Sequence, residues 1–576
     1  MNKTGVYKKI VTVGVFLLVV SVAGMGQGRG ISSNILGDGS FEKGMSPFGH
    51  WEENPSLGTV SVSEKSAHGG KSSVRMEVLR KAKDNWLVQL QRKGFNIRKN
   101  EVYELTFWVR REKAPAPIEV VFVKGSPPWS YYSGKTFTAD TAWTKCTMNF
   151  TAPYTTTDIQ LAFQGAHHPG VYYIDDISMK KAGEFDLKDV SSDWYEKAEQ
   201  RIDSLRKGDL SITIIDKNGK PYAGKLTYEH ESHEFEWGSC LNLHGNKDDK
   251  QYKKTFEKHF NAGVFENALK WEEFERVEGK PKHEDVEQYL RWSEEKGFPI
   301  RGHALVWGIE KYNYDQHWAR LKDDAFLVNA IRDRITRDVS YYKGRIPEYD
   351  VWNEPVHETA LFNRLGDDIL DSAFVWARRA DPDAKLYINE YSIISGMDAK
   401  AYRDLIQRLL DNGVPVDGIG VQGHFSGPVE PLEVASKLNY MAELGLPIKI
   451  TEFDIDVAQA GMGEQEMAQE YAEMFRTAFS HPAVEGLLIW GFWEERIWKR
   501  QCGWYDSDWN AKPVADTIYN LIHNHWSTDG EAKVEDGKHA FRGFYGTYRI
   551  HVKGKKEPVE VVLSSKNPSA TVDLTK

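Results

Sequence analysis

The second half of the chain repeats one short pattern at the points where a helical stretch gives way to an apolar run. A glycine and a proline, two positions apart, precede the apolar run within residues 296–299, 412–415 and 444–447. Glycine readily adopts the left-handed conformation that ends a helix, and proline cannot continue one, so the chain enters an extended strand. The stretch before the second junction has apolar residues at the spacing of one helix face: Tyr402, Leu405, Ile406 and Leu409. The pattern therefore predicts repeated helix-to-strand units.

Eight short apolar runs alternate with helical stretches in this part of the chain. They are residues 235–240, the run before Glu266, 301–307, 348–352, 385–391, 418–424, 448–453 and 487–492. Eight strands with helices between them favour a closed (β/α)8 barrel over an open doubly wound sheet, and the glycine-rich phosphate loops of nucleotide-binding sheets are missing. We therefore predict an α/β fold built around a TIM barrel.

Polar residues and tryptophans gather at the ends of these runs. In a (β/α)8 barrel the carboxyl ends of all strands face one mouth, so these side chains should converge there. They are Glu266, Asn267, Lys270, His303, Trp307, Asn353, Glu354, Asn389, Tyr391, Gln422, His424, Glu452, Asp454, Trp490 and Trp498. Either glutamate alone, Glu354 or Glu452, would more often cap a helix. Together with amides and rings, they are the proton donor and nucleophile that hydrolysis of a glycoside needs.

The runs also carry motifs of a known family. The chain resembles glycoside hydrolase family 10, the endo-β-1,4-xylanases, in motifs that occur in the right order across about residues 190–530. These are ENALKW (266–271), RGHALVW (301–307), VWNEP (351–355), GVQGH (420–424), ITEFD (450–454) and WGF (490–492). Gly308 stands where many members have a histidine, and residues 272–283 replace the usual run, so the departures concern the aglycone side and the preferred chain length.

The resemblance implies hydrolysis of xylan with retention of configuration, Glu354 acting as acid/base and Glu452 as nucleophile. It also implies that His424 contacts the nucleophile and that Asp454 orients this histidine. Asn353 is placed to bond the sugar 2-hydroxyl. The residues expected to bind substrate are Glu266, Asn267, Lys270, His303, Trp307, Tyr391, Gln422, Trp490 and Trp498. We expect no cofactor and no metal in the barrel.

Two other functions remain open. The first is a barrel hydrolase that cleaves another β-glycan, and the glycone contacts Glu266, Asn267 and Lys270 would discriminate it, because in xylanases they crowd out a hydroxymethyl group. The second is a non-catalytic glycan-binding protein. The intact pair of Glu354 and Glu452 argues against this second function.

Residues 34–181 have no helical period and contain strand-like runs separated by turn residues, which predicts an all-β sandwich. GDGSFEKG (37–44), YELTFWVRR (103–111) and YYIDDISM (172–179) resemble the jelly-roll carbohydrate-binding modules of cell-wall hydrolases. The resemblance allows a structural calcium at Asp38, Glu42 and Asp176, although acids that cap turns explain them equally well. The candidate rings for stacking on sugars are Trp86, Trp129, Tyr131 and Tyr132.

The two ends of the chain carry signals of their own. Three lysines precede the apolar run at residues 10–22, and small residues follow it, which predicts a signal peptide over residues 1–27 and a secreted, periplasmic or extracellular protein. We assign residues 186–530 to the barrel domain. Residues 531–576 alternate in the manner of strands and predict a small C-terminal β-appendage.

Charge and cysteine content limit the kinds of partner and of cysteine chemistry that the chain can have. The net charge of -10 and the lack of a long basic stretch exclude a general nucleic-acid binder. The N-terminal apolar run is too short for a comfortable membrane span, so we expect xylan or a related polysaccharide as partner, and no membrane after removal of the signal. Cys146, Cys240 and Cys502 lack metal-ligand spacing, which predicts buried free thiols.

Overall fold

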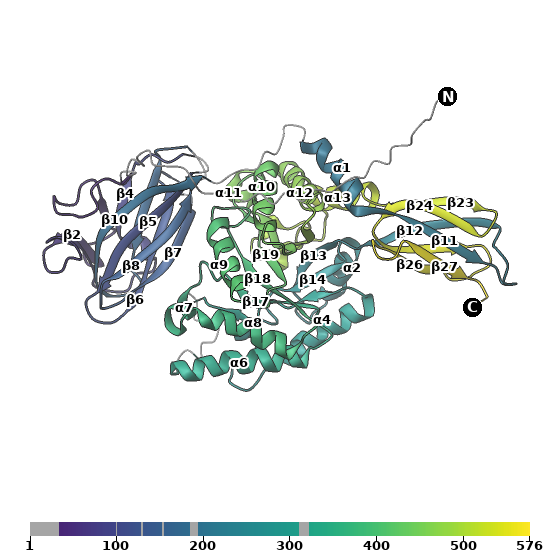
Figure 1. Ribbon diagram of the computed structural model, residues 1–576, viewed down its shortest axis with the longest axis horizontal. Coiled ribbons are helices and arrows are strands. Elements are labelled where there is room, and N and C mark those ends of the chain that lie inside the picture. The colour runs from purple at the N-terminus through teal and green to yellow at the C-terminus, as the bar shows by residue number, and fades with distance from the viewer. Residues whose placement is uncertain are drawn as a thin grey trace, which may run out of the picture.

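The computed structural model describes residues 34–98, 101–127, 129, 131–152, 155–184, 194–309, 319 and 322–575. A β-sandwich, a barrel with surrounding helices and a second β-rich module follow one another along the long axis (Figure 1). The predicted signal peptide at residues 1–27 lies outside the described residues. Within those residues, no helix has the length and apolar character that crossing a membrane requires.

The sandwich consists of two five-stranded sheets. One has the order β1 (Gly49–Glu52), β4 (Val88–Lys93), β9 (Ile159–Gln164), β6 (Ala116–Lys124) and β7 (Tyr131–Ala139). The other has the order β2 (Gly58–Ser63), β3 (Ser73–Val78), β10 (Gly170–Glu184), β5 (Glu101–Arg111) and β8 (Thr144–Thr151). Alternate residues of each strand fill the core between the sheets, as Leu105, Phe107 and Val109 of β5 do. The predicted all-β sandwich is confirmed.

Eight parallel strands form the barrel. The third consists of two short pieces, which pair with the strands on either side and so close the barrel. In barrel order they are β13 (Glu236–Leu241), β14 (Ala262–Phe265), β15 (Ile300–Arg301) with β16 (Val306–Trp307), β17 (Glu348–Asn353), β18 (Lys385–Glu390), β19 (Gly418–Val421), β21 (Ile448–Ile455) and β22 (Val484–Ile489). β15 pairs with β14, β16 pairs with β17, and β13 pairs with β22. The predicted (β/α)8 fold is confirmed. The predicted third strand, however, is broken into two short pieces.

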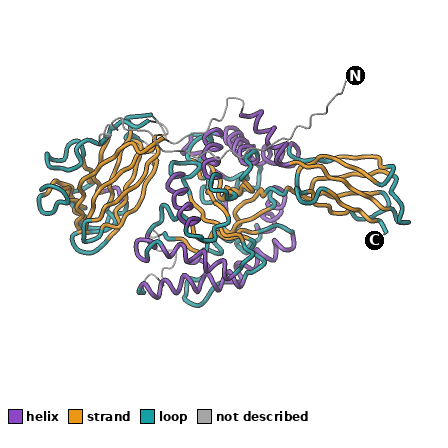
Figure 2. The backbone as a smooth tube through the Cα atoms, viewed as in Figure 1, coloured by secondary structure: helices purple, strands orange, loops and turns teal. Residues whose placement is uncertain are grey.

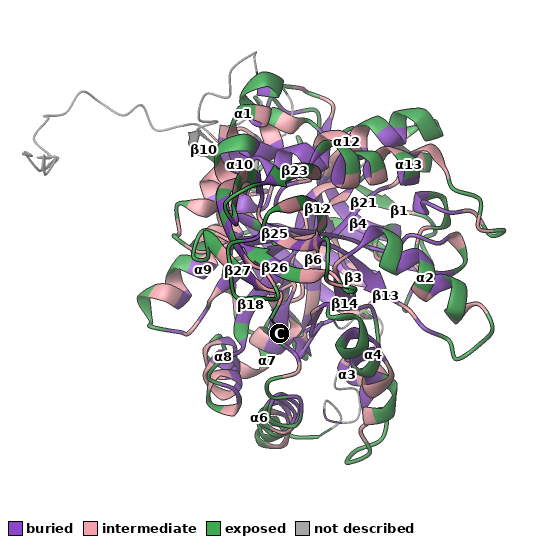
Figure 3. Ribbon diagram, turned by 90° about the vertical axis from the view of Figure 1, so that its right-hand side faces the viewer, coloured by how far each residue is buried: buried purple, intermediate pink, exposed green. Residues whose placement is uncertain are grey.

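Helices surround the barrel and turn their buried faces towards it, as Figures 2 and 3 show. They are α2 (Asp249–His259), α3 (Trp271–Phe274), α4 (His283–Lys296), α6 (Asp324–Tyr341), α7 (Ala360–Leu365), α8 (Asp368–Ala380), α9 (Ala399–Asp411), α10 (Pro431–Ala442), α11 (Val457–Ala460), α12 (Glu464–Phe479) and α13 (Pro513–Asn520). At the three predicted junctions Gly297, Gly413 and Gly445 adopt φ values of 76°, 70° and 76°. Glycine thus ends each helix in the left-handed conformation that the sequence predicted.

Paired charges fill the amino-terminal layer of the barrel interior. Arg301 Nη1 donates to Glu348 Oε1 at 2.8 Å, and its Nε donates to Asp350 Oδ2 at 3.1 Å. Lys449 Nζ donates to Glu348 Oε2 at 2.6 Å and to Glu236 Oε2 at 2.7 Å. Each charge has an opposite partner, which offsets the cost of removing it from water. This network joins four strands below the mouth.

The C-terminal module is made from two distant parts of the chain. After α1 (Trp194–Arg206), β11 (Lys207–Ile215) lies between β24 (Lys538–Phe544) and β27 (Ser569–Asp573). β12 (Gly224–His233) lies between β23 (Gly530–Val534) and β25 (Gly546–Val552), and β26 (Val559–Leu563) completes this sheet. The predicted barrel domain at residues 186–530 therefore needs correction near its start, because residues 207–233 belong to the same β-rich unit as the C-terminal tail.

The three cysteines Cys146, Cys240 and Cys502 are buried and free. Each lies in a different part of the fold, the first within β8, the second within β13 and the third near the end of the barrel domain. The prediction of buried free thiols is confirmed.

Candidate active site

Glu354 follows β17 directly and stands at the mouth of the barrel. Its φ of 58° turns the chain away from the strand, and its N–H donates to Asn389 O at 2.8 Å. Trp307 Nε1 donates to Glu354 Oε2 at 2.7 Å, and Gln422 Nε2 donates to Oε1 at 2.8 Å. Both oxygens of this carboxyl group are thus held by neighbouring strand ends.

Glu452 lies inside β21 and is only 5% exposed. Asn389 Nδ2 donates to Glu452 Oε1 at 2.8 Å. His424 Nε2 lies 3.4 Å from Oε2, and His303 Nδ1 lies 4.0 Å from Oε1. The carboxyl group is therefore fixed in place by one amide and two histidines.

The two carboxyl groups differ in protonation. Burial raises the pKa of Glu354 to about 7, and the negative charges of Glu390 and Glu452 add to this effect. Burial also raises the pKa of Glu452, but His303 and His424 outweigh burial, so the net pKa lies below its ordinary value. One mouth thus holds a carboxylic acid and a carboxylate, the two states that acid/base and nucleophile require.

His424 connects Glu452 to residues behind it. Its Nδ1 lies 3.0 Å from Asp454 Oδ1, and Trp498 Nε1 donates to Asp454 Oδ2 at 2.5 Å. Burial lowers the pKa of His424, but the charges and hydrogen bonds of Asp454 and Glu452 raise it to about 9 overall. A protonated His424 can donate to Glu452 and keep it ionised.

Three amides link the two carboxyl groups. Asn389 Nδ2 donates to Asn353 Oδ1 at 2.9 Å as well as to Glu452, and Gln422 Nε2 lies 3.4 Å from the same Asn353 oxygen. Thr451 Oγ1 donates to Asn389 Oδ1 at 2.7 Å and so fixes the orientation of that amide. The separation of the catalytic pair is thus set by side chains on adjacent strands.

The predicted glycone residues form a cluster beside the carboxyl groups. Asn242 Nδ2 donates to Glu266 Oε2 at 2.5 Å, and Lys270 Nζ donates to Asn267 Oδ1 at 3.3 Å. The Lys270 ammonium lies 5.0 Å from the ring centre of Trp307, which also bonds Glu354. The cluster therefore adjoins the acid.

A second group of predicted residues lies around His303 and Tyr391. Trp490 makes edge contact with His303, whose Nδ1 lies 2.9 Å from Asp350 Oδ2. Tyr391 stacks on His357 with ring centres 3.9 Å apart. The structure thus brings the predicted catalytic and substrate-binding residues to strand ends at one mouth, with Tyr391 stacked on His357 just after β18.

Sequence reasoning gave no role to several residues that act here. Asn389 was expected at the mouth but without a function, although it holds Glu452 directly. Glu390 and His357 were missed, and they form a pair 2.9 Å apart. An acid at the end of the fifth apolar run was the available signal for Glu390. Asn242 directly follows β13, so its place at a strand end was the available signal for it.

The three acids that the sequence suggested as calcium ligands contact neighbouring protein groups. Asp38 Oδ1 accepts the N–H two residues further on, and Glu42 Oε1 accepts the N–H groups of residues 71–72. Asp176 Oδ2 lies 2.7 Å from His68 Nδ1. In the described part of the chain, no three His, Cys, Asp or Glu side chains are placed to hold a metal ion. The calcium site stays a prediction, and so does the alternative of acids that cap turns.

Two of the four candidate rings of the sandwich are exposed, namely Trp86 and Trp129. Tyr132 packs against the sandwich core. The side chain of Tyr131 lies outside the described residues.

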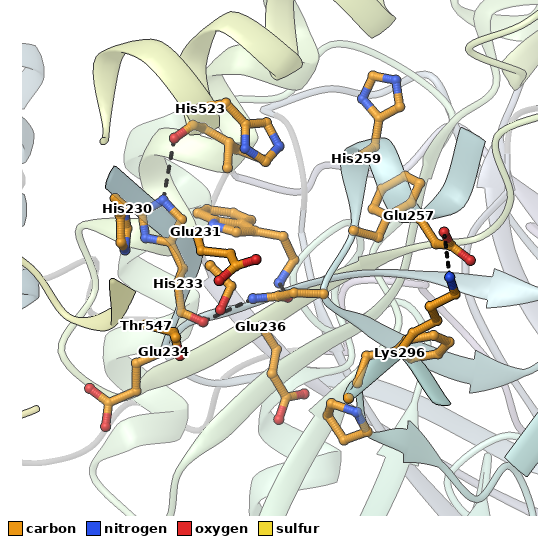
Figure 4. Close-up of a pocket in the computed structure, with 18 of the residues that line it drawn as sticks. His230, Glu231, His233, Glu234, Glu236, Glu257, His259, Lys296, His523 and Thr547 are labelled. Carbon is orange, nitrogen blue, oxygen red and sulfur yellow. Dashed lines mark hydrogen bonds and ion pairs between the residues drawn. The ribbon is translucent and has the colours of Figure 1, made fainter. Parts of the chain in front are cut away.

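A cavity of about 550 Å³ opens at the other end of the barrel strands, between the barrel and the C-terminal module (Figure 4). His230, His233, Glu236 and His259 are among the residues that line it. None of the predicted site residues does so. The cavity is therefore separate from the paired carboxyl groups, and we assign the chemistry to the mouth.

Comparison with known proteins identifies relatives that match part of the chain. Among curated proteins, the anti-sigma-I factor RsgI6 of Acetivibrio thermocellus is 33% identical over 63% of this chain and 47% of its own length. Endo-1,4-beta-xylanase 1 of Arabidopsis thaliana is 31% identical over 61% of this chain and 37% of its own length. The chain thus spans less than half the length of these relatives. Xylanase 10B from Thermotoga petrophila RKU-1, solved in complex with xylobiose, matches 51% of this chain and 95% of its own with 26% identity and a TM-score of 0.47.

Two family models match the chain in succession. The model described as a carbohydrate binding domain matches residues 33–170. The model of glycosyl hydrolase family 10 matches residues 227–521, just over half of the chain, and includes every barrel residue placed at the mouth. The chain therefore belongs to glycosyl hydrolase family 10.

Proposed function

We propose that this protein is an endo-β-1,4-xylanase that cleaves internal bonds of xylan with retention of anomeric configuration. The observation that carries the proposal is the opposite pKa shift of two carboxyl groups, with the pKa of partly buried Glu354 raised to about 7 and that of buried Glu452 lowered. The endo-1,4-beta-xylanases among the relatives support the choice of substrate.

In the first half of the reaction, Glu452 attacks the anomeric carbon and the bond to the leaving sugar breaks. Glu354 gives its proton to the departing oxygen, which leaves as a hydroxyl group. Asn389 and His424 hold the attacking oxygens, while Trp307 and Gln422 hold the acid. Neither group needs to reorient before the reaction.

In the second half, Glu354 accepts a proton from water, and the resulting hydroxide displaces Glu452 from the sugar. The charge of ionised Glu452 raises the pKa of Glu354, and this effect disappears once Glu452 is bonded to the sugar. The same carboxyl group therefore becomes a better base when a base is required.

The glycone cluster favours a sugar without a hydroxymethyl group. Lys270 lies over Trp307 and within 5.7 Å of the ring centre of Trp490, and Glu266 is held beside it by Asn242. In the xylanases that the chain resembles, these contacts crowd out a hydroxymethyl group, so the cluster supports xylan over a β-glucan.

Replacement of the two carboxyl groups tests the proposal. Glu452→Gln should abolish cleavage of all xylans, whereas Glu354→Gln should reduce it by about 10²–10⁴-fold and spare substrates whose leaving group needs no proton. Glu295→Gln, which alters an exposed acid near the end of α4, is the matched control and should keep full activity. Products from a panel of xylans and β-glucans, followed by NMR, report substrate and configuration. Preferential cleavage of a glucan, or inversion, would refute the assignment.

We also propose that the protein is exported, because residues 1–27 combine lysines, an apolar run and small residues. Mature protein recovered outside the cytoplasm should begin beyond the apolar run. An N-terminus that retains Met1 or the lysines would contradict this.

A further inference from the structure

The sandwich contacts the loops that follow β17 and β18, the first of which starts at Glu354. Ser133 of β7 is completely buried, and its Oγ donates to Asp398 Oδ1 at 2.9 Å. Thr359 Oγ1 of the barrel donates to Thr136 O at 3.1 Å. Side chains of β7 and of residues 355–363 also line a shared cavity of about 300 Å³. Figure 1 accordingly shows β7 on the side of the sandwich that faces the barrel.

A polar row crosses the sheet that contains β7, on the face that points away from the sandwich core. Directly paired residues of neighbouring strands lie on the same face of a sheet. The row runs through all five strands in the order Trp51, Gln89, Gln164, Glu119 and Thr136. The sequence neighbours Leu90, Phe163, Val120 and Phe137 point into the core instead. The row spans about 19 Å, from four interstrand steps of about 4.8 Å.

The row has the chemistry that a sugar chain requires. Trp51 is 47% exposed and offers an apolar ring face, whereas Gln89 is only 7% exposed. Gln89 Oε1 is a buried oxygen without a hydrogen-bond partner among the described residues. Asn85 Nδ2 holds Glu119 Oε2 at 3.0 Å and so fixes a carboxylate in the row. Sugar hydroxyl groups would satisfy the unpartnered acceptor, and a sugar face would cover the ring.

The inner end of the row approaches the segment that follows the acid. Glu358 N donates to Glu354 O at 2.8 Å. Burial and the charge of Glu354 raise the pKa of Glu358 to about 8, and Glu119 of the sandwich is close enough to contribute. β18, which also contacts the sandwich through its following loop, stands opposite β13 in the barrel. The row therefore approaches the cleft on the side away from the glycone cluster.

We propose that the docked sandwich extends the catalytic cleft on the leaving-group side, so that its polar row binds distal sugar units of the same xylan chain that the barrel cleaves. This inference rests on the proposed function. Its consequence is kinetic, because contacts to distant sugar units raise kcat/KM only for chains long enough to reach them. A sandwich that merely anchors the enzyme to insoluble material would give no such dependence on length.

Measurement of kcat/KM against xylo-oligosaccharide length tests the inference on the full chain. Trp51→Ala should lower kcat/KM for long soluble chains by roughly two- to tenfold, as expected for loss of one ring contact, and leave xylotetraose unchanged. Leu79→Ala removes an exposed apolar side chain just after β3 of the other sheet and should change neither value. Equal values for the native protein and Trp51→Ala at every length would overturn the inference.

A second variant separates docking from binding. Ser133→Lys places a charged side chain at a fully buried contact and should release the sandwich from the barrel. The inference predicts that this variant loses the advantage on long soluble chains while its sandwich still binds insoluble xylan. Retention of the full advantage would overturn it. If the native protein cleaves no xylo-oligosaccharide of any length, the proposed function itself fails, which is a different result from activity without length dependence.

Discussion

Glu390 influences the acid although it lies behind the mouth. Among the neighbouring charges, its carboxylate contributes most to the raised pKa of Glu354, second only to burial. Its own position is fixed by His357 at 2.9 Å and by the N–H of Val356 at 2.7 Å. Glu390 is thus a positioning residue whose charge should set the upper end of the pH range for activity.

Replacement of Glu390 by Gln should move only one limb of the pH profile. Activity requires protonated Glu354 and ionised Glu452, so kcat/KM should fall above about pH 7 and also at acidic pH. Removal of the Glu390 charge lowers the pKa of Glu354, and the alkaline limb should shift to lower pH. The acidic limb should stay in place, because Glu452 is governed by His303 and His424. An unchanged alkaline limb would show that the charge of Glu390 has no influence.

At this scale the sequence predicted the reactive groups but not their environment. Glu354 and Glu452 were identifiable because each ends an apolar run within a motif. Asn389 and Glu390 act through residues on neighbouring strands, and strand adjacency is a property of the closed barrel rather than of any local pattern.

At the scale of single elements, the helix-to-strand junctions depend on the backbone conformation of one glycine. Gly413 ends α9 at a φ of 70°, and a side chain there would meet no atom within 4 Å. Space is thus available, and only backbone conformation demands glycine. Because this conformation favours glycine, the glycine itself predicts the end of the helix in the sequence.

Gly413→Ala should cost about 1 kcal/mol in the free energy of unfolding without a change in kcat/KM. Gly427→Ala is the matched control, because Gly427 also has open space around it but no left-handed backbone. Denaturant unfolding compares the two variants. An equal loss of stability in both would show that the φ of Gly413 is not the cause.

The third barrel strand differs from the prediction, because one apolar run does not form one continuous strand. RGHALVW is one apolar run, yet only residues 300–301 and 306–307 are strand. Between them, Gly302 N donates to Glu348 O and Leu305 N donates to Asp350 O. An apolar run indicates burial, but it does not show which backbone groups form the regular hydrogen bonds of a β-sheet.

At the scale of the whole molecule, the C-terminal module ties the two ends of the barrel domain together. Its core combines Leu210, Ile212 and Leu226 from before the barrel with Val534 and Ile550 from after it. The sequence indicated strands in both segments. Their pairing could not be predicted, because hydrophobic alternation shows that a strand has a buried face but not which distant strand covers it.

A chain that ends at residue 530 should therefore be less stable and more prone to aggregation than the full chain. β11 and β12 would lose their strand partners, and the apolar faces of both would be exposed. A chain that ends at residue 573, just after β27, is the control and should behave as the full chain does. Thermal unfolding and size-exclusion chromatography report the difference. Identical behaviour of both truncations would show that the tail is dispensable.

The divided module also fixes an order of events during synthesis. β12 ends at His233, and its partner β23 starts only at Gly530, so the whole barrel must be translated between them. At about 5–20 residues per second, the ribosome needs roughly 15–60 s for this stretch. During that interval the first two strands of the module have emerged without the strands that complete their sheets. The barrel, which brings the two segments together, is therefore the natural template on which the last part of the chain assembles.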